Sequence, residues 1–293
     1  MKRRLLLISL FIGILSITGF AQKPEKDNTS ISILAIGNSF SVDAMEYLWG
    51  ILDQAGYENV TLGNLYIGGC SLERHAGNFK NNSAAYTYYK NTEGTWSKTK
   101  EYQPLEALNE RDWDIITMQQ SSGNSGITAT FDPHLAELIT IVKANCPDAG
   151  LAWHMTWAYQ GNSTHRDFPR YENNQMTMYN AIIAAVQEKI ITNDAFCKII
   201  PNGTAIQNLR TSFIGDTLTR DGYHMSHDKG RLVTAMTFAK ALTGCDLQKI
   251  TYTPSEHSYT QEELSAMKEA ANNACAAPFT VTVSLFPPAG AQE

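Results

Sequence analysis

Short apolar segments alternate with longer amphipathic ones along most of the chain, and no other feature restricts the possible fold as strongly. Five of the short segments have the length and composition of buried strands: residues 31–36, 60–66, 114–118, 151–157 and 197–200. Apolar residues recur at helical spacing in four of the longer segments: residues 42–55, 134–145, 173–191 and 226–242. Strands that alternate with helices form parallel sheets covered by helices on both faces. The sequence therefore predicts a three-layer α/β/α fold of the flavodoxin-like type, with a five-stranded parallel sheet.

The first 21 residues have the arrangement of an export signal. Three basic residues at positions 2–4 precede an apolar run from Leu5 to Ile17, and small residues follow up to Ala21. A retained membrane anchor is the alternative, but the run is shorter than the roughly 20 residues that a spanning helix needs. No Cys stands at the cleavage position, so we expect no lipid anchor there. The pattern predicts a periplasmic or secreted protein without stable membrane insertion after cleavage.

The rest of the chain suits a single large domain. We expect residues 1–21 to be a signal peptide, 22–30 a linker, 31–245 the domain, and 246–293 a helix and tail packed on it. Within the tail, residues 261–273 have a helical pattern, and the apolar run 279–286 is a candidate edge strand. Residues 71–103 are rich in Asn, Ser, Thr, Tyr and Gly and are too long for an ordinary connection, so we expect a loop that helps to form a site.

The charge balance and the cysteines exclude some classes of function. Without the signal segment, 20 basic residues face 29 acidic ones, a net charge of −9. Nucleic acids and anionic membranes select for an excess of Lys and Arg, so neither is an expected partner. The five cysteines lie far apart without a C-x-x-C pair. An exported protein could close one or two disulfides, but the spacing identifies no pair, and we interpret the cysteines as buried free thiols.

One candidate nucleophile follows the first predicted strand. Gly37-Asn38-Ser39 lies between this strand and a helix, and open α/β sheets bind their ligands beyond the carboxyl ends of the strands. Ser and Asn are also common caps at helix N-termini, so Ser39 could serve only as a cap. A nucleophilic serine needs a base, and the sequence must supply one.

A candidate base stands just before the last predicted helix, in Asp221-Gly222-Tyr223-His224. A spacing of three lets the Asp on a turn reach the imidazole of the His, which fixes its tautomer and leaves the other nitrogen free for a serine. The loop after the first strand and the loop before the last helix open on the same edge of a parallel sheet. Ser39, His224 and Asp221 are therefore predicted to meet.

These motifs resemble those of a known hydrolase superfamily. Gly-Asn-Ser after the first strand and Asp-x-x-His before the last helix resemble the first and last motif blocks of the SGNH (GDSL-like) hydrolases. More narrowly, three runs resemble a poorly characterised branch found in exported bacterial proteins: Ile36-Gly37-Asn38-Ser39-Phe40-Ser41, Gly68-Gly69-Cys70-Ser71-Leu72-Glu73-Arg74-His75 and Met118-Gln119-Gln120-Ser121-Ser122. The resemblance covers about residues 31–245.

The resemblance implies a serine esterase that needs no cofactor. Ser39 would be the nucleophile, His224 the general base and acid, and Asp221 the residue that orients it. Members of the superfamily hold the oxyanion with the backbone N–H of the serine, a glycine N–H and a side-chain amide. By position these donors would be Ser39, Gly69 (or Gly68) and Gln119.

The third block departs from the superfamily pattern. Where Gly-x-Asn-Asp is usual, this chain has Gln119-Gln120-Ser121-Ser122-Gly123-Asn124. A Gln carboxamide offers the same N–H donors as Asn, so Gln119 could act, with Gln120 or Asn124 as substitutes. The alternative is a polar junction with weakened or lost activity.

Other reaction classes have less support in the sequence. The α/β-hydrolase elbow G-x-S-x-G is absent, because residue 41 is Ser. His224, His227 and Asp228 could suggest a metal, but two His three apart are insufficient and H-E-x-x-H is missing. We therefore expect no metal site. No phosphate-binding glycine motif follows any predicted strand.

The substrate is indicated only by aromatic residues and by the resemblance. The 71–103 segment holds several of them: Tyr86, Tyr88, Tyr89, Trp96 and Tyr102. His75 and Trp157 are candidate substrate contacts, although a surface His and packed aromatics are the simpler interpretation. Related exported enzymes often remove acetyl groups from glycans, so the resemblance implies short acyl esters on carbohydrate. A lipase or thioesterase, or a glycan-binding protein with little activity, stays an alternative.

Overall fold

A seven-stranded sheet forms the centre of the protein. The structure, a computed structural model, describes residues 29–288. The strands lie in the order β4-β3-β2-β1-β5-β6-β7. Their bounds are β1 Ser30–Gly37, β2 Asn59–Tyr66, β3 Tyr86–Asn91, β4 Trp96–Tyr102, β5 Ile115–Met118, β6 Gly150–His154 and β7 Phe196–Ile200. The five predicted strands are β2, β1, β5, β6 and β7, which pair in parallel. The three-layer α/β prediction is confirmed, with two strands more than expected.

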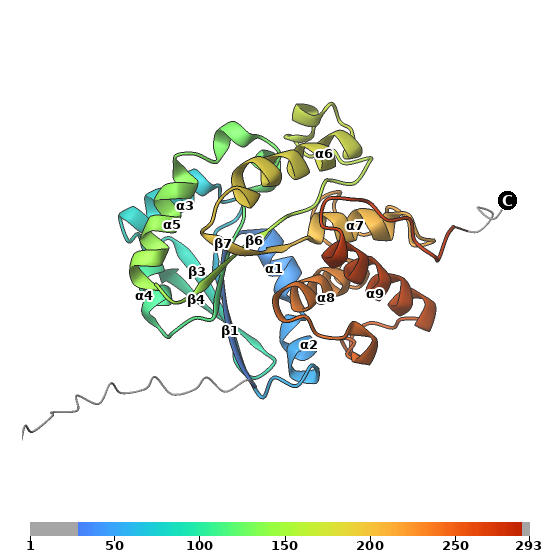
Figure 1. Cartoon of the computed structure of the whole chain (residues 1–293), viewed down its shortest axis with the longest axis horizontal. Coiled ribbons are helices and arrows are strands. Elements are labelled where there is room, and N and C mark those ends of the chain that lie inside the picture. Colours follow the sequence, from blue (N-terminus) through green and yellow to red (C-terminus); the bar gives the residue numbers. More distant parts are fainter. Residues whose placement is uncertain (1–28, 289–293) are drawn as a thin grey trace, which may run out of the picture.

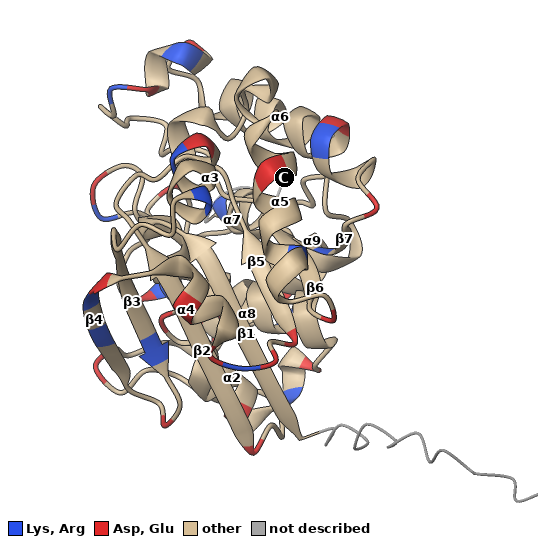
Figure 2. Cartoon of the chain, turned by 90° about the vertical axis from the view of Figure 1, so that its left-hand side faces the viewer, with Lys and Arg blue, Asp and Glu red and all other residues tan. Residues whose placement is uncertain are grey.

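The two additional strands lie in the 71–103 segment, which we expected to be a loop. Ser71 caps the helix α3 (Leu72–Lys80), and β3 then pairs antiparallel with both β2 and β4. Tyr86 and Tyr88 are buried on one face of β3, an alternation that the many polar neighbours conceal in the sequence. Charged residues lie along β4 at the edge of the sheet, whereas β1 and β2 have none (Figure 2). Charges on an edge strand discourage pairing with another chain.

Helices cover both faces of the sheet (Figure 1). One layer contains α1 Ser39–Met45, α2 Leu48–Gln54, α7 Asn202–Arg210, α8 Lys229–Thr243 and α9 Gln261–Ala276, and the other contains α3, α4 Pro104–Asn109 and α5 His134–Asn145. The helix α6 (Gln175–Val186) connects β6 to β7 and continues into a π-helical turn at 187–191. The predicted helix 42–55 is divided into α1 and α2.

The region after β7 differs most from the sequence prediction. The helix α7 was not predicted, because several of its buried residues are polar: Asn202, Thr204, Gln207 and Asn208. The run 279–286 forms no strand. Instead, the Thr282 N–H donates to Asn208 Oδ1 (2.7 Å) and the Ser284 N–H to Thr211 Oγ1 (2.8 Å), so this run packs beside α7. The candidate edge strand is thus corrected to an extended segment held by side chains.

Predictions were also made for the five cysteines and for the N-terminal segment. The five cysteines are unpaired, but only Cys70 and Cys146 are buried, and Cys197 is exposed. The predicted signal peptide, residues 1–21, lies outside the described residues. Within residues 29–288, no helix has the length and apolar character required to cross a membrane.

Candidate active site

Ser39 lies at the carboxyl edge of the sheet, directly after β1. Asn38, with an extended backbone, caps α1: its Oδ1 accepts the Phe40 N–H at 3.0 Å. Ser39 is thus the first residue of the helix and not its cap. Because the cap is supplied by its neighbour, the Ser39 hydroxyl is available for another partner.

That partner is His224. The Ser39 Oγ lies 2.8 Å from His224 Nε2, and Nδ1 of the same ring lies 2.7 Å from Asp221 Oδ2. A carboxylate only accepts, so the Nδ1–H donates to Asp221 and Nε2 is left to accept the serine proton. Burial acts to raise the pKa of Asp221, but hydrogen bonds from the His224 side chain and from the backbone N–H groups of His224 and Tyr223 lower it more. Asp221 is therefore a carboxylate at neutral pH.

The turn that carries His224 is closed on itself. Thr219 and Met225 form an isolated antiparallel bridge, and the Arg220 N–H donates to the His224 carbonyl at 2.9 Å. Gly222 has a φ of +90°, and a Cβ there would meet Ser163 at about 3 Å, so the turn requires glycine. This backbone arrangement brings Asp221 and His224 together.

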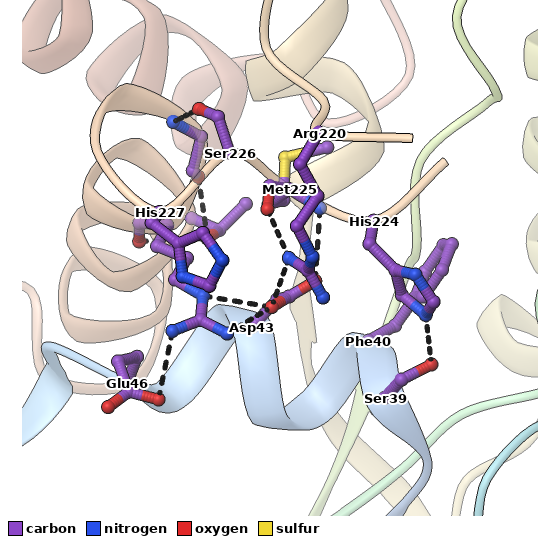
Figure 3. A network of polar contacts seen from close by, with 12 residues as sticks. Ser39, Phe40, Asp43, Glu46, Arg220, His224, Met225, Ser226 and His227 are labelled. Atoms are coloured by element: carbon purple, nitrogen blue, oxygen red, sulfur yellow. Dashed lines mark hydrogen bonds and ion pairs between the residues drawn. The ribbon is translucent and has the colours of Figure 1, made fainter. Parts of the chain in front are cut away.

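A buried carboxylate joins the turn to the helix that carries Ser39 (Figure 3). Asp43, one helical turn after Ser39, is 1% exposed and lies 3.0 Å from Arg220 Nη1 and 2.9 Å from Arg231. Asp43 Oδ2 also accepts the Met225 N–H at 3.0 Å. Roles for Asp43 and Arg220 were not predicted from the sequence. Helical spacing from Ser39 and adjacency to Asp221 were the available signals.

Two backbone turns border the cavity around Ser39. Its volume is about 380 Å³, and its lining includes Gly68, Gly69, Ser122 and His165. Within the described part of the chain, neither the Ser39 nor the Gly69 backbone N–H donates to a protein acceptor. Gly69 has a φ of +60°, a conformation that favours glycine. Both N–H groups are thus available to an oxyanion.

The third predicted donor is placed differently. Gln119 is 2% exposed and does not line the cavity; its amide N–H donates to Asn38 Oδ1 at 2.9 Å. Neither possible substitute lines the cavity: the Gln120 amide N–H donates to the Thr130 carbonyl at 3.0 Å, and Asn124 Oδ1 accepts from Arg170. Among residues 119–124, Ser122 lines the cavity. Gln119 thus contacts the residue before the nucleophile instead of facing the cavity.

Gln119 belongs to a buried chain of polar side chains that crosses the ends of the parallel strands. Asn202 Nδ2 donates to His154 Nε2 (2.9 Å), and His154 Nδ1–H donates to Gln119 Oε1 (2.9 Å). Asn38 Oδ1 accepts the Gln119 amide N–H, and Asn38 Nδ2 donates to the Cys70 carbonyl at 3.2 Å. Burial lowers the pKa of His154 to about 3, so its ring is neutral at pH 7. The chain fixes Asn38 between the Ser39 turn and the Gly69–Cys70 turn.

His75 and Trp157, the predicted substrate contacts, lie in the core. His75 is 0% exposed, and its Nδ1 lies 2.9 Å from the Tyr86 hydroxyl. Trp157 is also 0% exposed; it stacks on Phe40 at 4.2 Å, and its indole N–H donates to the Tyr223 carbonyl at 2.7 Å. Neither residue can contact a substrate in this structure. Trp157 instead supports the His224 turn.

His165 is a cavity residue that the sequence analysis missed. Its ring packs against Tyr223 (4.5 Å between centroids) and Tyr159 (4.6 Å). Burial lowers the pKa of His165. It reaches the cavity from the long connection after β6, which has no motif that points to it. Among residues 29–288, no three His, Cys, Asp or Glu side chains gather as a metal-binding group.

Comparisons with known proteins give the chain a family. A crystal structure of a DUF4886 family protein from Bacteroides uniformis is 41% identical, with a TM-score of 0.83, and the match covers 87% of this chain and 98% of that one. A Slackia heliotrinireducens protein, whose description proposes an SGNH hydrolase, is 18% identical with a TM-score of 0.47, covering 73% and 99%. TesA is 12% identical with a TM-score of 0.44, covering 72% and 98%. A search of curated proteins finds no match. Residues 32–274 match the sequence profile described as "Domain of unknown function (DUF4886)", and the chain belongs to this family.

Proposed function

We propose that the protein is an exported serine esterase of the SGNH type that hydrolyses short acyl esters, O-acetyl groups on carbohydrate in particular. One observation carries the proposal: His224 lies between Ser39, at 2.8 Å, and Asp221, at 2.7 Å. A serine hydroxyl is activated for acyl transfer when it is hydrogen-bonded to an imidazole that a carboxylate orients. The motifs of residues 31–245 and the export signal of residues 1–21 are the remaining support.

The proposed reaction has two halves. Ser39 Oγ attacks the ester carbonyl while its proton moves to His224 Nε2. The tetrahedral intermediate collapses, the bond to the alcohol oxygen breaks, and His224 protonates that oxygen. Water then attacks the acyl-serine and gives a proton to His224, and the collapse releases the acid and returns the proton to Ser39 Oγ. Asp221 stays ionised and stabilises the imidazolium in both halves.

The backbone N–H groups of Ser39 and Gly69 would hold the oxyanion. Donors directed at developing charge supply a large share of the rate of acyl-transfer enzymes. For Gln119 we propose a positioning role: it orients Asn38, which caps α1 and donates to the Cys70 carbonyl beside Gly69. Gln is therefore compatible with position 119, because its side chain contacts Asn38 and does not need to reach the substrate.

The first experiment is a comparison of wild-type protein with Ser39→Ala on p-nitrophenyl acetate. We expect kcat to fall by about 10⁴-fold or more, since removing one member of such a triad leaves only residual rate enhancement. Mass-spectrometric mapping of a fluorophosphonate adduct should place it on Ser39 in the wild type. Unchanged turnover in Ser39→Ala, with near-ultraviolet circular dichroism showing an intact fold, would overturn the proposal.

The alternatives have their own outcomes. A lipase or thioesterase would prefer octanoyl or longer esters, and a p-nitrophenyl ester series from acetyl to octanoyl decides this. A glycan-binding protein without activity would bind oligosaccharides but fail to react with the fluorophosphonate. Release of acetate from acetylated polysaccharides would identify the proposed substrate class.

A further inference from the structure

A second, larger cavity adjoins the one around Ser39. Its volume is about 740 Å³, and it shares Val42 and Tyr89 with the catalytic cavity. One wall is α1 and the residues after it, from Val42 to Tyr47. The β3–β4 hairpin and residues 252–256 supply most of the remaining lining, with Asn64 and Arg231. The two cavities therefore adjoin at Val42 and Tyr89, and we call the larger one, with its opening toward the nucleophile, the groove.

The length of the groove exceeds the size of an acetyl ester. Val42 is three residues and Glu46 seven residues after Ser39 along a helix, and both line the larger cavity. At 1.5 Å per residue, the groove extends about 10 Å from the nucleophile. An acetyl group fills only a small part of the 380 Å³ catalytic cavity, so the larger cavity is free to take another part of a substrate.

Partly exposed aromatic rings line the groove together with charged side chains. Trp96 and Tyr252 are both half-buried, and the Trp96 indole N–H donates to the Glu46 carbonyl at 3.2 Å, which fixes the ring. Lys98 lies 4.8 Å from the centroid of the Tyr89 ring. The Tyr252 ring lies against Gly50 of α2. Aromatic rings that are held in place give contact area at small entropic cost.

The charges of the groove balance. Glu46 and Glu256 face Lys98 and Arg231, and Arg231 Nη1 lies 3.3 Å from Glu46 Oε2. An acyl chain in this groove would bury apolar surface against charged groups and desolvate them, which is unfavourable. A polyanion would find no excess of positive charge. A neutral ligand with both apolar faces and hydroxyl groups fits rings, carboxylates and cations together.

We propose that this groove binds the alcohol part of the substrate, a neutral oligosaccharide of several sugar units, with Trp96 and Tyr252 as stacking surfaces. The inference rests on the proposed esterase function. It adds that the alcohol, which is the leaving group, lies on the side of Ser39 where the groove is. Sugar rings stack their C–H faces on Trp96 and Tyr252, and their hydroxyl groups bond to Glu46, Glu256, Lys98 and Arg231. The acyl group then lies at Ser39, with the carbonyl oxygen toward Gly69.

The binding step is tested without catalysis, in the Ser39→Ala protein. Isothermal titration calorimetry with neutral β-1,4-linked gluco-, xylo- and manno-oligosaccharides of one to six units should show affinity that rises about tenfold or more from one unit to four in at least one series. Trp96→Ala in the same background should remove most of that gain, because truncating an aromatic anchor commonly weakens binding about tenfold or more. Trp96→Phe should retain part of it, because a flat ring remains.

The kinetic step uses the active protein. Trp96→Ala and Tyr252→Ala should lower kcat/KM on an O-acetylated tetrasaccharide about tenfold more than on p-nitrophenyl acetate. Phe213→Ala is the matched control: Phe213 is 37% exposed and lies outside the groove, so both substrates should react as in the wild type.

Three results would overturn the inference. Affinity independent of oligosaccharide length in every series means that the groove is not a glycan site. A larger effect of Trp96→Ala on p-nitrophenyl octanoate than on oligosaccharides assigns the groove to an acyl chain, and tighter, salt-dependent binding of uronate oligomers assigns it to an anionic polymer. If the wild-type protein had no esterase activity but still bound oligosaccharides with length-dependent affinity, the proposed function would be rejected and the groove would remain a glycan site.

Discussion

At the scale of single residues, the hydrogen bond between Ser39 and His224 depends on what the neighbouring residues do. Asn38 takes the position of helix cap, so the serine hydroxyl is left for His224. Asp221 has two duties: one oxygen accepts the imidazole N–H, and the other accepts the backbone N–H groups of Tyr223 and His224. The same carboxylate therefore shapes the turn and selects the tautomer.

These two duties can be separated by Asp221→Asn. The amide oxygen can still accept both backbone N–H groups, so the turn should persist. The amide nitrogen, however, cannot accept from His224 Nδ1–H, and the ring should shift to the tautomer that cannot take the Ser39 proton. We expect kcat on p-nitrophenyl acetate to fall by about 10³–10⁴-fold with KM nearly unchanged.

Asp53→Asn serves as the control, because Asp53 is an exposed carboxylate on α2. It should leave kcat at the wild-type value. If Asp221→Asn retained more than a tenth of the activity, Asp221 would have no role beyond shaping the turn.

At the scale of elements, the site depends on how α1 is attached to the 219–226 turn. Asp43 is the connection, since it bonds to Arg220 and Met225 of the turn and to Arg231 of α8 (Figure 3). Ser39 and His224 are 185 positions apart, and Asp43 is the buried carboxylate that holds their two elements in register.

Asp43→Asn should therefore impair catalysis and stability together. Removing one member of a buried ion pair costs about 3–5 kcal/mol, and we expect somewhat less here because Arg220 is 30% exposed. At temperatures where the variant is still folded, we expect kcat to fall about 10–100-fold, and the rate at which a fluorophosphonate labels Ser39 to fall by a similar factor. Misplacement of reacting groups by about 1 Å lowers a rate by that much.

Asp228→Asn makes the same chemical change at the N-terminus of α8, close in sequence to the 219–226 turn, and leaves Asp43 intact. It should preserve the labelling rate. Equal losses in the two variants would mean that Asp43 acts only through general stability.

At the scale of the whole molecule, two histidines buried on different elements couple folding to pH. Burial lowers the pKa of both His75 and His154 from about 6.5 to about 3. The unfolded chain therefore binds these protons at a pH where the folded chain does not. Their stabilising contribution is fully present above about pH 6.5 and is lost as the pH falls toward 3.

Urea denaturation at pH 5.5 and 4.5 measures this coupling. Each neutral buried histidine should add about 1.4 kcal/mol per pH unit to the slope of the free energy of unfolding. His75→Gln should reduce the slope by about that amount whatever it does to stability at pH 7, and so should His154→Gln. A slope equal to that of the wild type would show that the replaced histidine becomes protonated in the folded state.

Local patterns predicted much of the architecture. The five parallel strands follow from short apolar runs, α5 occupies the predicted residues 134–145, and α8 ends at Gly244, whose φ of +75° only glycine adopts readily. The β3–β4 hairpin and α7 were missed. Their buried positions hold Tyr, Asn, Gln and Thr, residues that become core only when a partner across the sheet or in α9 satisfies them.

The sequence by itself determined the five parallel strands and the meeting of Ser39, Asp221 and His224. These depend on hydrophobic periodicity, on a spacing of three residues, and on the shared edge of a parallel sheet. Only the tertiary structure decided which side chains line the cavities at and beside Ser39. Gln119, His75 and Trp157 were candidates by position, yet each is buried by neighbours from distant segments. His165 lines the cavity around Ser39, and Trp96 lines the adjoining one. Side-chain exposure is a property of long-range packing, and no local pattern in the chain contains it.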